Sequence, residues 1–434
     1  MNKYRSPRDN NYNGERRGGR GGSYRENRDY REQRGTRSYA EQEDEPQNDI
    51  ANVPEIQSFE EMGLSDDVLR CIYAYGFEYP SYIQSVAIKP IVDGRELIAQ
   101  SQSGTGKTGT FVIGCLHKIE PLKLYPQAII MTNTRELALQ IDKVVRDFGD
   151  HMKLNTAVCV GKTDIADNIA AVRKAHIIIG TPGRALDIIK RKVFDPERVK
   201  IFVMDEADEL LRKDFKDQMR EIINYLSKET QICVFSATLP RDVLDTCNCF
   251  LKDPLRLLLR REDLTLDLIA QYYIDVQQDD YKLTVLEDLY NKFSINQCII
   301  YVNSRMRAED LKQQLNDNKH TVEMIHSEID AIARSNIMKR FRNSDFRVLI
   351  STDLLARGID IQQVSFVINY DIPDSVENYL HRIGRSGRFG KRGVAINFVT
   401  KHDLRQMRFI EDHYHHRIQE MPDPVEVVAY LTSG

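Results

Sequence analysis

The 434-residue sequence has no tryptophan, no long apolar run and no Cys-x-x-Cys pair. No stretch approaches the roughly 18 apolar residues that a membrane-spanning helix needs, and the N-terminus has no apolar segment, so we expect neither a span nor a secretory signal. The seven scattered cysteines predict neither a zinc site nor a disulfide framework, which favours a reducing compartment. The remaining composition, 41% hydrophobic and 29% charged residues, is typical of a soluble globular protein with a sizeable core.

The first 50 residues contain no Leu, Val, Phe or Cys, so they cannot offset the entropy cost of ordering, and we predict disorder. Residues 1–40 carry 11 basic residues against five acidic ones, with Arg, Gly and Tyr interleaved. This pattern is typical either of a segment that contacts RNA without sequence preference or of a solvated tail. Residues 41–55 hold six acidic residues and no Lys or Arg, which predicts a linker. We therefore expect residues 1–55 to form an N-terminal tail.

From about residue 56, short apolar runs alternate with amphipathic stretches such as 108–119 and 135–148. The predicted strands form two series: 96–99, 127–132, 156–160, 176–179, 200–204 and 231–235, then 297–302, 321–325, 347–351, 366–369 and 393–398. This alternation indicates an α/β fold with parallel sheets covered by helices. Because the pattern stops near residues 252–268 and restarts, we expect one domain over 56–258, a linker over 259–268 and a second domain over 269–434.

The loop after the first predicted strand reads Ser-Gln-Ser-Gly-Thr-Gly-Lys-Thr over residues 101–108. Gly104 and Gly106 allow backbone N–H groups to close around phosphate oxygens, and the following helix adds its N-terminal dipole. We expect Lys107 to reach the β- and γ-phosphates and the Thr108 hydroxyl to ligate Mg²⁺. Since the loop joins a strand to a helix, we interpret it as a P-loop rather than an ordinary Gly-rich turn.

An acidic tetrapeptide, Asp-Glu-Ala-Asp, follows the apolar strand that ends at Met204. A P-loop needs a second carboxylate at the end of another strand to hold the metal, and Asp205 stands at that place. Glu206 can polarise a water for in-line attack, which is a general-base role. An isolated acidic tetrapeptide would usually be a solvated turn, but the buried strand and the P-loop favour the catalytic interpretation.

A basic run, His-Arg-Ile-Gly-Arg-Ser-Gly-Arg, occupies residues 381–388. Arg385 and Arg388 are three residues apart, so on one helical turn they project to the same side. Hydrolysis requires cations near the γ-phosphate charge, and these two can supply them. A basic run of this kind, taken by itself, more often forms a solvent-exposed helix face. The catalytic interpretation therefore depends on closure of the two halves around a nucleotide.

These motifs resemble those of the DEAD-box RNA helicases of superfamily 2, and the runs TDLLARGIDIQQV and VINYDIP make the chain most similar to the translation initiation factor 4A group. The resemblance covers roughly 56–434 and keeps the family's motif order: Q-motif 76–84, P-loop 101–108, Ia 134–138, Ib 181–184, acidic box 205–208, III 236–238, IV 299–304, V 351–360 and VI 381–388. It implies two tandem RecA-like domains. It also implies an ATP hydrolase that uses ATP and Mg²⁺ for local, sequence-independent unwinding or remodelling of RNA, in translation initiation or related RNA metabolism.

The resemblance further implies a role for single residues. Gln84 would contact the adenine edge, and Tyr73 or Phe77 would pack on the adenine ring. The nucleotide would also be bound by Ser103, Gly104, Thr105, Gly106, Lys107, Thr108 and Asp360. Catalysis would involve Lys107, Asp205 and Glu206, with Arg385 and Arg388 as arginine fingers. Arg135, Gly183, Arg184 and Thr352 would line the RNA groove, and Ser236 and Thr238 would couple hydrolysis to strand separation.

Two other functions stay open from the sequence: an ATP-dependent RNA clamp that rarely turns over, and a DNA translocase of the wider superfamily, which the Q-motif and motif III disfavour. The implied partners are RNA and scaffold proteins of the translation or ribonucleoprotein machinery. We expect a monomer in the cytoplasm, with the nucleus as an alternative. One departure from the family pattern is Lys162, which stands where the family usually has Gly and would add a donor near the RNA path.

Overall fold

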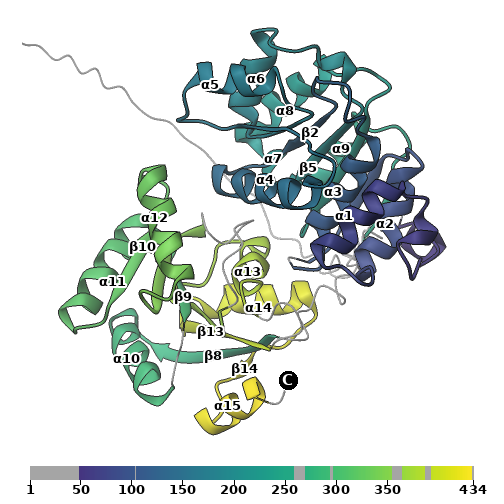
Figure 1. Cartoon of the computed structure of the whole chain (residues 1–434). Coiled ribbons are helices and arrows are strands. Elements are labelled where there is room, and N and C mark those ends of the chain that lie inside the picture. Colours follow the sequence, from purple (N-terminus) through teal and green to yellow (C-terminus); the bar gives the residue numbers. More distant parts are fainter. Residues whose placement is uncertain are drawn as a thin grey trace, which may run out of the picture. The chain divides into compact units, whose positions relative to one another are not determined.

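The computed structural model describes residues 48–102, 104–258, 269–293, 297–353, 364–386 and 392–432. Outside these described residues lie the tail to residue 47, the predicted linker 259–268 and three site candidates, Ser103, Asp360 and Arg388. The described residues form two seven-stranded parallel sheets with flanking helices (Figure 1). The predicted α/β class with parallel sheets is therefore confirmed.

The first sheet has the strand order β3-β4-β2-β5-β6-β1-β7. Its strands are β1 (Leu97–Gln100), β2 (Ala128–Met131), β3 (Thr156–Cys159), β4 (Ile177–Gly180), β5 (Ile201–Asp205), β6 (Gln231–Ser236) and β7 (Leu255–Leu257). Its helices are α1 (Asp66–Tyr75), α2 (Tyr82–Val92), α3 (Lys107–Lys118), α4 (Arg135–Gly149), α5 (Ile165–Val172), α6 (Pro182–Lys190), α7 (Ala207–Leu210), α8 (Lys213–Tyr225) and α9 (Arg241–Asn248).

The second sheet has the order β10-β11-β9-β12-β13-β8-β14. Its strands are β8 (Ile269–Gln277), β9 (Cys298–Tyr301), β10 (Val322–Ile325), β11 (Val348–Ser351), β12 (Phe366–Asn369), β13 (Gly393–Thr400) and β14 (Gln419–Glu420). Its helices are α10 (Lys282–Lys292), α11 (Arg305–Asp317), α12 (Ala331–Arg342), α13 (Val376–Ile383), α14 (Leu404–Tyr414) and α15 (Pro424–Thr432). No helix among the described residues is long and apolar enough to cross a lipid bilayer.

The central strands are buried on both faces, which explains their continuous apolar runs. In β5, Ile201 and Val203 belong to one core cluster, whereas Phe202 and Met204 belong to another. Successive strand side chains point to opposite faces of a sheet, so each face of the first sheet packs against its own helices. A strand that is buried on both faces needs apolar residues at every position, and this uninterrupted apolar run is what predicted the strand from the sequence.

Three strands were not predicted: β7, β8 and β14. They lie at one end of each strand order. β7 has two buried leucines around an arginine, β8 is partly buried and β14 is exposed. Residues 48–55 also differ from the expected tail. The Asp49 backbone N–H donates to the Arg256 carbonyl at 2.8 Å, and the Arg256 N–H donates to the Asp49 carboxylate at 2.9 Å. This segment therefore lies along the edge of β7.

The topology brings three predicted motifs to neighbouring places. The P-loop follows β1, the acidic box follows β5 and motif III follows β6, and these strands are adjacent in the order β5-β6-β1. Because the sheet is parallel, the three loops meet at its carboxyl edge, where ligands bind in α/β folds.

Candidate functional site

The P-loop is shaped by two glycines with left-handed backbone. Gly104 has φ +86° and Gly106 has φ +109°, values that strain other residues. A Cβ atom on Gly106 would lie 2.7 Å from the Ser81 hydroxyl oxygen and 3.0 Å from the Gln84 side-chain nitrogen. The start of α2, which carries the end of the Q-motif, therefore packs directly on the loop, and only glycine fits at position 106.

The Lys107 side chain is held by carbonyl groups of its own loop. Lys107 is buried, and its ammonium donates to the Ser101 carbonyl and, at 3.2 Å, to the Gln102 carbonyl. The hydroxyls of Ser101 and Thr105 are hydrogen-bonded at 2.5 Å. Thr108, one residue into α3, is partly buried. The described part of the loop thus places one cation and the hydroxyls of Thr105 and Thr108 close to the N-terminus of α3.

Two carboxylates stand at the end of β5. Asp205 is buried, and burial is the main cause that raises its pKa to about 7, with the neighbouring Glu206 adding to the rise and Lys107 opposing it. Glu206 has a left-handed backbone, φ +54° and ψ +54°, which is unusual for a non-glycine residue. Its Oε2 atom is buried and has no hydrogen-bond partner among the described residues. Backbone strain and a buried oxygen without a hydrogen bond both reduce the stability of the folded state, and such features concentrate at functional sites.

Asp208 joins three segments of the chain. Its carboxylate accepts hydrogen bonds from the Ser236 hydroxyl at 2.7 Å and the Thr238 hydroxyl at 2.8 Å. The His381 Nε2 atom, from α13 beside the second sheet, lies 3.2 Å from the Asp208 Oδ2 atom. All four side chains are buried. The predicted coupling residues therefore contact the acidic box directly, and His381 brings motif VI to the same carboxylate.

His381, Asp208 and Glu206 also form a group whose potential ligand atoms lie within 4.8 Å of one another. The hydrogen bonds of Asp208 to the other two motifs already account for its position in this group. We therefore interpret the cluster as a junction between motifs.

Arg382 is a buried residue whose role the sequence analysis missed. Its guanidinium donates to the Asp353 carboxylate at 2.5 and 3.0 Å, to the Asn303 side chain at 2.7 Å and to the Asp371 carbonyl at 2.8 Å. It also lies over the Tyr301 ring, 5.3 Å from the centroid. Arg382 thus ties α13 to the ends of β9, β11 and β12.

The predicted arginine fingers are only partly described. Arg385 is 1% exposed, and its Nε atom donates to the His381 carbonyl at 3.2 Å, while Arg388 lies outside the described residues. The structure therefore places Arg385 beside the His381 junction, and does not describe the pair.

The candidate adenine residues surround the start of α2 and α3. Gln84 is 3% exposed, and its Oε1 atom accepts the Ser81 backbone N–H at 2.8 Å as part of a helix capping box. Phe77 is partly buried and stacks on Phe59, with ring centroids 6.4 Å apart. Tyr73 is 43% exposed and donates to the Glu60 carboxylate, a bond that raises the Tyr73 pKa to about 12. Of the two aromatic candidates, Phe77 lies nearer the P-loop, because its ring would meet a Cβ atom on Gly109.

Two of the predicted RNA-groove residues converge on one loop. Arg135, at the start of α4, donates to the Gly161 carbonyl at 3.2 Å. Arg184 donates to the Thr163 carbonyl at 2.9 Å and to the Thr163 hydroxyl at 3.0 Å, and also bonds Asn168. Gly183 is exposed beside Arg184. Both guanidiniums therefore order the loop 161–163, while exposed Lys162, with φ +61°, projects from it.

Thr352, the remaining groove candidate, follows β11 in the second sheet. Its backbone N–H donates to the Ile325 carbonyl at 3.3 Å, and its carbonyl accepts the Ser351 hydroxyl at 2.7 Å. Thr352 is partly buried, and it stands directly before Asp353, the partner of Arg382.

The chain matches two family profiles: "DEAD/DEAH box helicase" over residues 81–246 and "Helicase conserved C-terminal domain" over residues 281–390. It is 47% identical over 371 residues to "Eukaryotic initiation factor 4A" of Caenorhabditis elegans, which covers 85% of this chain and 92% of that protein. It is 49% identical over 383 residues to "ATP-dependent RNA helicase eIF4A" of Chaetomium globosum, covering 88% of this chain and 96% of that protein.

Solved structures agree with the sequence relatives. Dbp5 of Saccharomyces cerevisiae, bound to RNA and ADP BeF3, superposes with a TM-score of 0.80 at 35% identity, covering 86% of this chain and all of that chain. Mss116p bound to ssRNA and AMP-PNP gives a TM-score of 0.77 at 26% identity, covering 88% of this chain and 84% of that chain. The predicted tandem RecA-like fold is confirmed by these matches. The chain belongs to the DEAD/DEAH box helicase family and is a DEAD-box helicase of the eIF4A group.

Proposed function

We propose that this protein is an ATP-dependent RNA helicase that couples ATP binding and hydrolysis to local, sequence-independent remodelling of RNA in translation initiation. The names of the relatives support the activity and the process. The RNA and nucleotide analogues bound to Dbp5 and Mss116p support the two ligands. We place the protein in the cytoplasm as a monomer that acts with scaffold proteins of the translation machinery.

ATP would be held between the P-loop and the Q-motif. The backbone around Gly104 and Gly106 and the dipole of α3 would bind the phosphates. Lys107 would exchange its loop carbonyl partners for phosphate oxygens, which carry a full negative charge and make stronger hydrogen bonds. Phe77 would face the adenine, with the Gln84 amide reading its edge.

Mg²⁺ would be held by Thr108 and Asp205. The donor set fits this ion, because Mg²⁺ prefers hydroxyl, carboxylate and phosphate oxygens. Asp205 fits in a second way: its buried carboxylate has a pKa of about 7, so its ionised form benefits from a nearby cation. When bound, the ion would neutralise charge on the phosphates.

Hydrolysis would depend on Glu206. Its unsatisfied buried Oε2 atom is available to accept a hydrogen bond from the attacking water and then its proton. Arg385 and Arg388 would stabilise the charge that develops on the γ-phosphate. The strained backbone of Glu206 fixes the direction of its side chain before the reaction begins.

Coupling would run through Asp208, and this contact is the observation that carries the proposal. Asp208 is hydrogen-bonded to Ser236 and Thr238 of motif III and lies 3.2 Å from His381 of motif VI. A change at the γ-phosphate that moves the acidic box must therefore act on both other motifs. ATP and RNA would favour the same closed arrangement because each binds groups from both halves, and hydrolysis would release it.

The test is a comparison of ATP turnover and strand separation with RNA and with DNA of the same sequence. The proposal predicts ATP turnover that RNA stimulates and DNA does not, together with separation of a short RNA duplex. Turnover limited to a single round would indicate the RNA clamp instead. Equal stimulation by DNA would indicate the translocase.

A further inference from the structure

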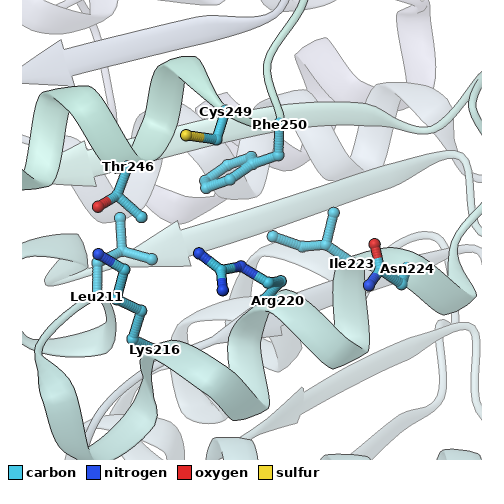
Figure 2. A pocket seen from close by; sticks show the side chains of 8 residues that line it. All are labelled: Leu211, Lys216, Arg220, Ile223, Asn224, Thr246, Cys249 and Phe250. Atoms are coloured by element: carbon cyan, nitrogen blue, oxygen red, sulfur yellow. The ribbon is translucent and has the colours of Figure 1, made fainter.

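A pocket of about 180 Å³ lies between α8 and α9, on the face of the first sheet that α6 also covers (Figure 2). Its apolar wall is made by Leu211 and Ile223 on the α8 side and by Phe250 on the α9 side. Lys216 and Arg220 extend from α8 toward Thr246 and Phe250 on the opposite side. The pocket therefore combines an apolar surface with two cationic groups.

The two cations have no acidic partner among the described residues. Lys216 and Arg220 are one helical turn apart on α8 and line the same pocket. Their neighbours are paired instead: Lys190 bonds Glu221 at 2.9 Å, and Arg212 bonds Glu209 at 2.9 Å. Among the described residues, Lys216 and Arg220 thus make no ion pair, and they stand beside apolar side chains.

The size of the pocket selects the ligand class. Pockets for drug-sized molecules and nucleotides span roughly 300–1,000 Å³, whereas a cavity of about 150 Å³ accepts one benzene ring. A pocket of about 180 Å³ accordingly fits one aromatic or branched apolar side chain. An extended base and ribose would not fit, so the apolar wall favours a peptide over RNA.

The walls of the pocket are continuations of the catalytic motifs. Leu211 comes three residues after Asp208, and α9 begins three residues after Thr238. Asp208 and Thr238 are hydrogen-bonded to each other at 2.8 Å. A ligand that contacts both α8 and α9 would therefore restrain the acidic box and motif III relative to one another.

We propose that this pocket docks an acidic segment of a partner protein, in which one Phe- or Leu-sized side chain enters the apolar wall and flanking carboxylates pair with Lys216 and Arg220. Docking restrains α8 against α9 and so changes the rate of ATP turnover. This effect on turnover rests on the proposed function, whereas the docking itself does not.

Cys249 lines the pocket, so the rate at which its thiol is labelled can report whether the pocket is occupied. This thiol is exposed, whereas the six other cysteines are buried, and burial raises the pKa of Cys115 and Cys298 to about 12. A neutral thiol reagent should therefore label the full-length protein first at Cys249. The labelling rate is measured with a synthetic peptide, acetyl-Ser-Asp-Glu-Phe-Glu-Asp-Ser-amide, over a range of peptide concentrations.

We expect the peptide to slow labelling about tenfold when its concentration reaches ten times Kd, as mass action requires. The double variant Lys216→Glu with Arg220→Glu should need at least about tenfold more peptide for the same protection of Cys249, because both proposed charge pairs become repulsive. Lys292→Glu, a single charge reversal at an exposed position on α10 of the second sheet, should match the unmodified protein. A peptide with Gly in place of Phe should protect weakly.

Three results would overturn the docking proposal: no protection by the peptide, equal protection of the double variant, or protection by an RNA oligonucleotide in place of the peptide. Slower labelling at higher protein concentration without peptide would point to a second copy as the occupant and would also contradict it. A separate assay of RNA-stimulated ATP turnover, with and without peptide, tests the regulatory part. If the protein lacks that turnover altogether, the proposed function fails while the labelling result still decides the docking.

Discussion

The Arg334 guanidinium lies 3.1 Å from the Glu136 carboxylate and joins α12 of the second sheet to α4 of the first. Both side chains are largely buried, at 11% and 15% exposure. Asp330, the N-cap of α12, accepts backbone N–H groups, which lower its pKa, and Lys162 and Arg334 lower it further. The start of α12 thus carries charges opposite to those of Glu136 in motif Ia and of Lys162.

We expect Glu136→Ala and Arg334→Ala each to reduce RNA-stimulated ATP turnover, because each removes a contact between the two halves. A double-mutant cycle on the apparent RNA affinity should give a coupling of about 0.5–3 kcal/mol, the range for residues in direct contact. The exposed pair Arg305 and Glu309, 3.4 Å apart on α11, is the matched control and should show no coupling in this assay. Additive effects of the Glu136 and Arg334 variants would contradict this role.

Glu206→Gln should keep ATP and RNA binding but lose turnover. The amide preserves the shape of the side chain, while its neutral oxygen is a far weaker base, so we expect a loss of about 10²–10⁴-fold. Phosphate release measures turnover, and nucleotide and RNA titrations measure binding. Glu229→Gln, an exposed residue between α8 and β6, serves as the control. Normal phosphate release from the Glu206 variant would refute the general-base assignment.

Lys107→Ala should weaken ATP binding. The ammonium is a charge-assisted donor, and losing such a bond costs about 1.5–3 kcal/mol, or roughly 10–100-fold in affinity. Lys143→Ala, an exposed lysine on α4, changes the same charge away from the loop and should leave ATP affinity unaltered. Thermal unfolding of both variants separates a loss of fold from a loss of binding. Unchanged nucleotide affinity in the Lys107 variant would count against the P-loop.

Arg382→Ala should destabilise the protein. It leaves the Asp353 carboxylate, which is 32% exposed, without its bidentate partner, and losing hydrogen bonds to a charged group costs about 1.5–3 kcal/mol each. Arg382→Lys should recover little of this, because one ammonium cannot reach the partners that the planar guanidinium bonds together. Urea unfolding measures the loss, with Arg417→Ala, an exposed arginine paired to Glu411, as the control. Equal stability of the Arg382 and Arg417 variants would contradict the structural role of Arg382.

The central strands and the P-loop could be predicted because each leaves a strong local signal. β5 is buried on both faces and therefore reads as an apolar run that ends at Asp205, and Gly104 and Gly106 show where left-handed backbone is needed. The weak strands gave no such signal. β7 is three residues long and has an arginine at its centre, and β14 is fully exposed.

The contacts between distant segments could not be predicted. In the sequence Arg382 looks like any surface arginine of a basic run, and only the fold shows that it is buried beside Asp353. The pairing of Asp208 with His381 spans 173 residues, a separation for which a single sequence holds no periodic signal. The attachment of residues 48–55 to β7 likewise depends on backbone hydrogen bonds that composition does not encode.

The most direct test of the account is the RNA-stimulated ATP turnover of His381→Ala, measured beside its ATP affinity. The imidazole contacts the Asp208 carboxylate, which also holds Ser236 and Thr238, and it is remote in sequence from the P-loop. We predict that ATP affinity stays within about twofold while stimulation by RNA falls at least about tenfold, equivalent to the loss of one buried contact of about 1.4 kcal/mol. Full stimulation by RNA in this variant would contradict the claim that hydrolysis is coupled through Asp208.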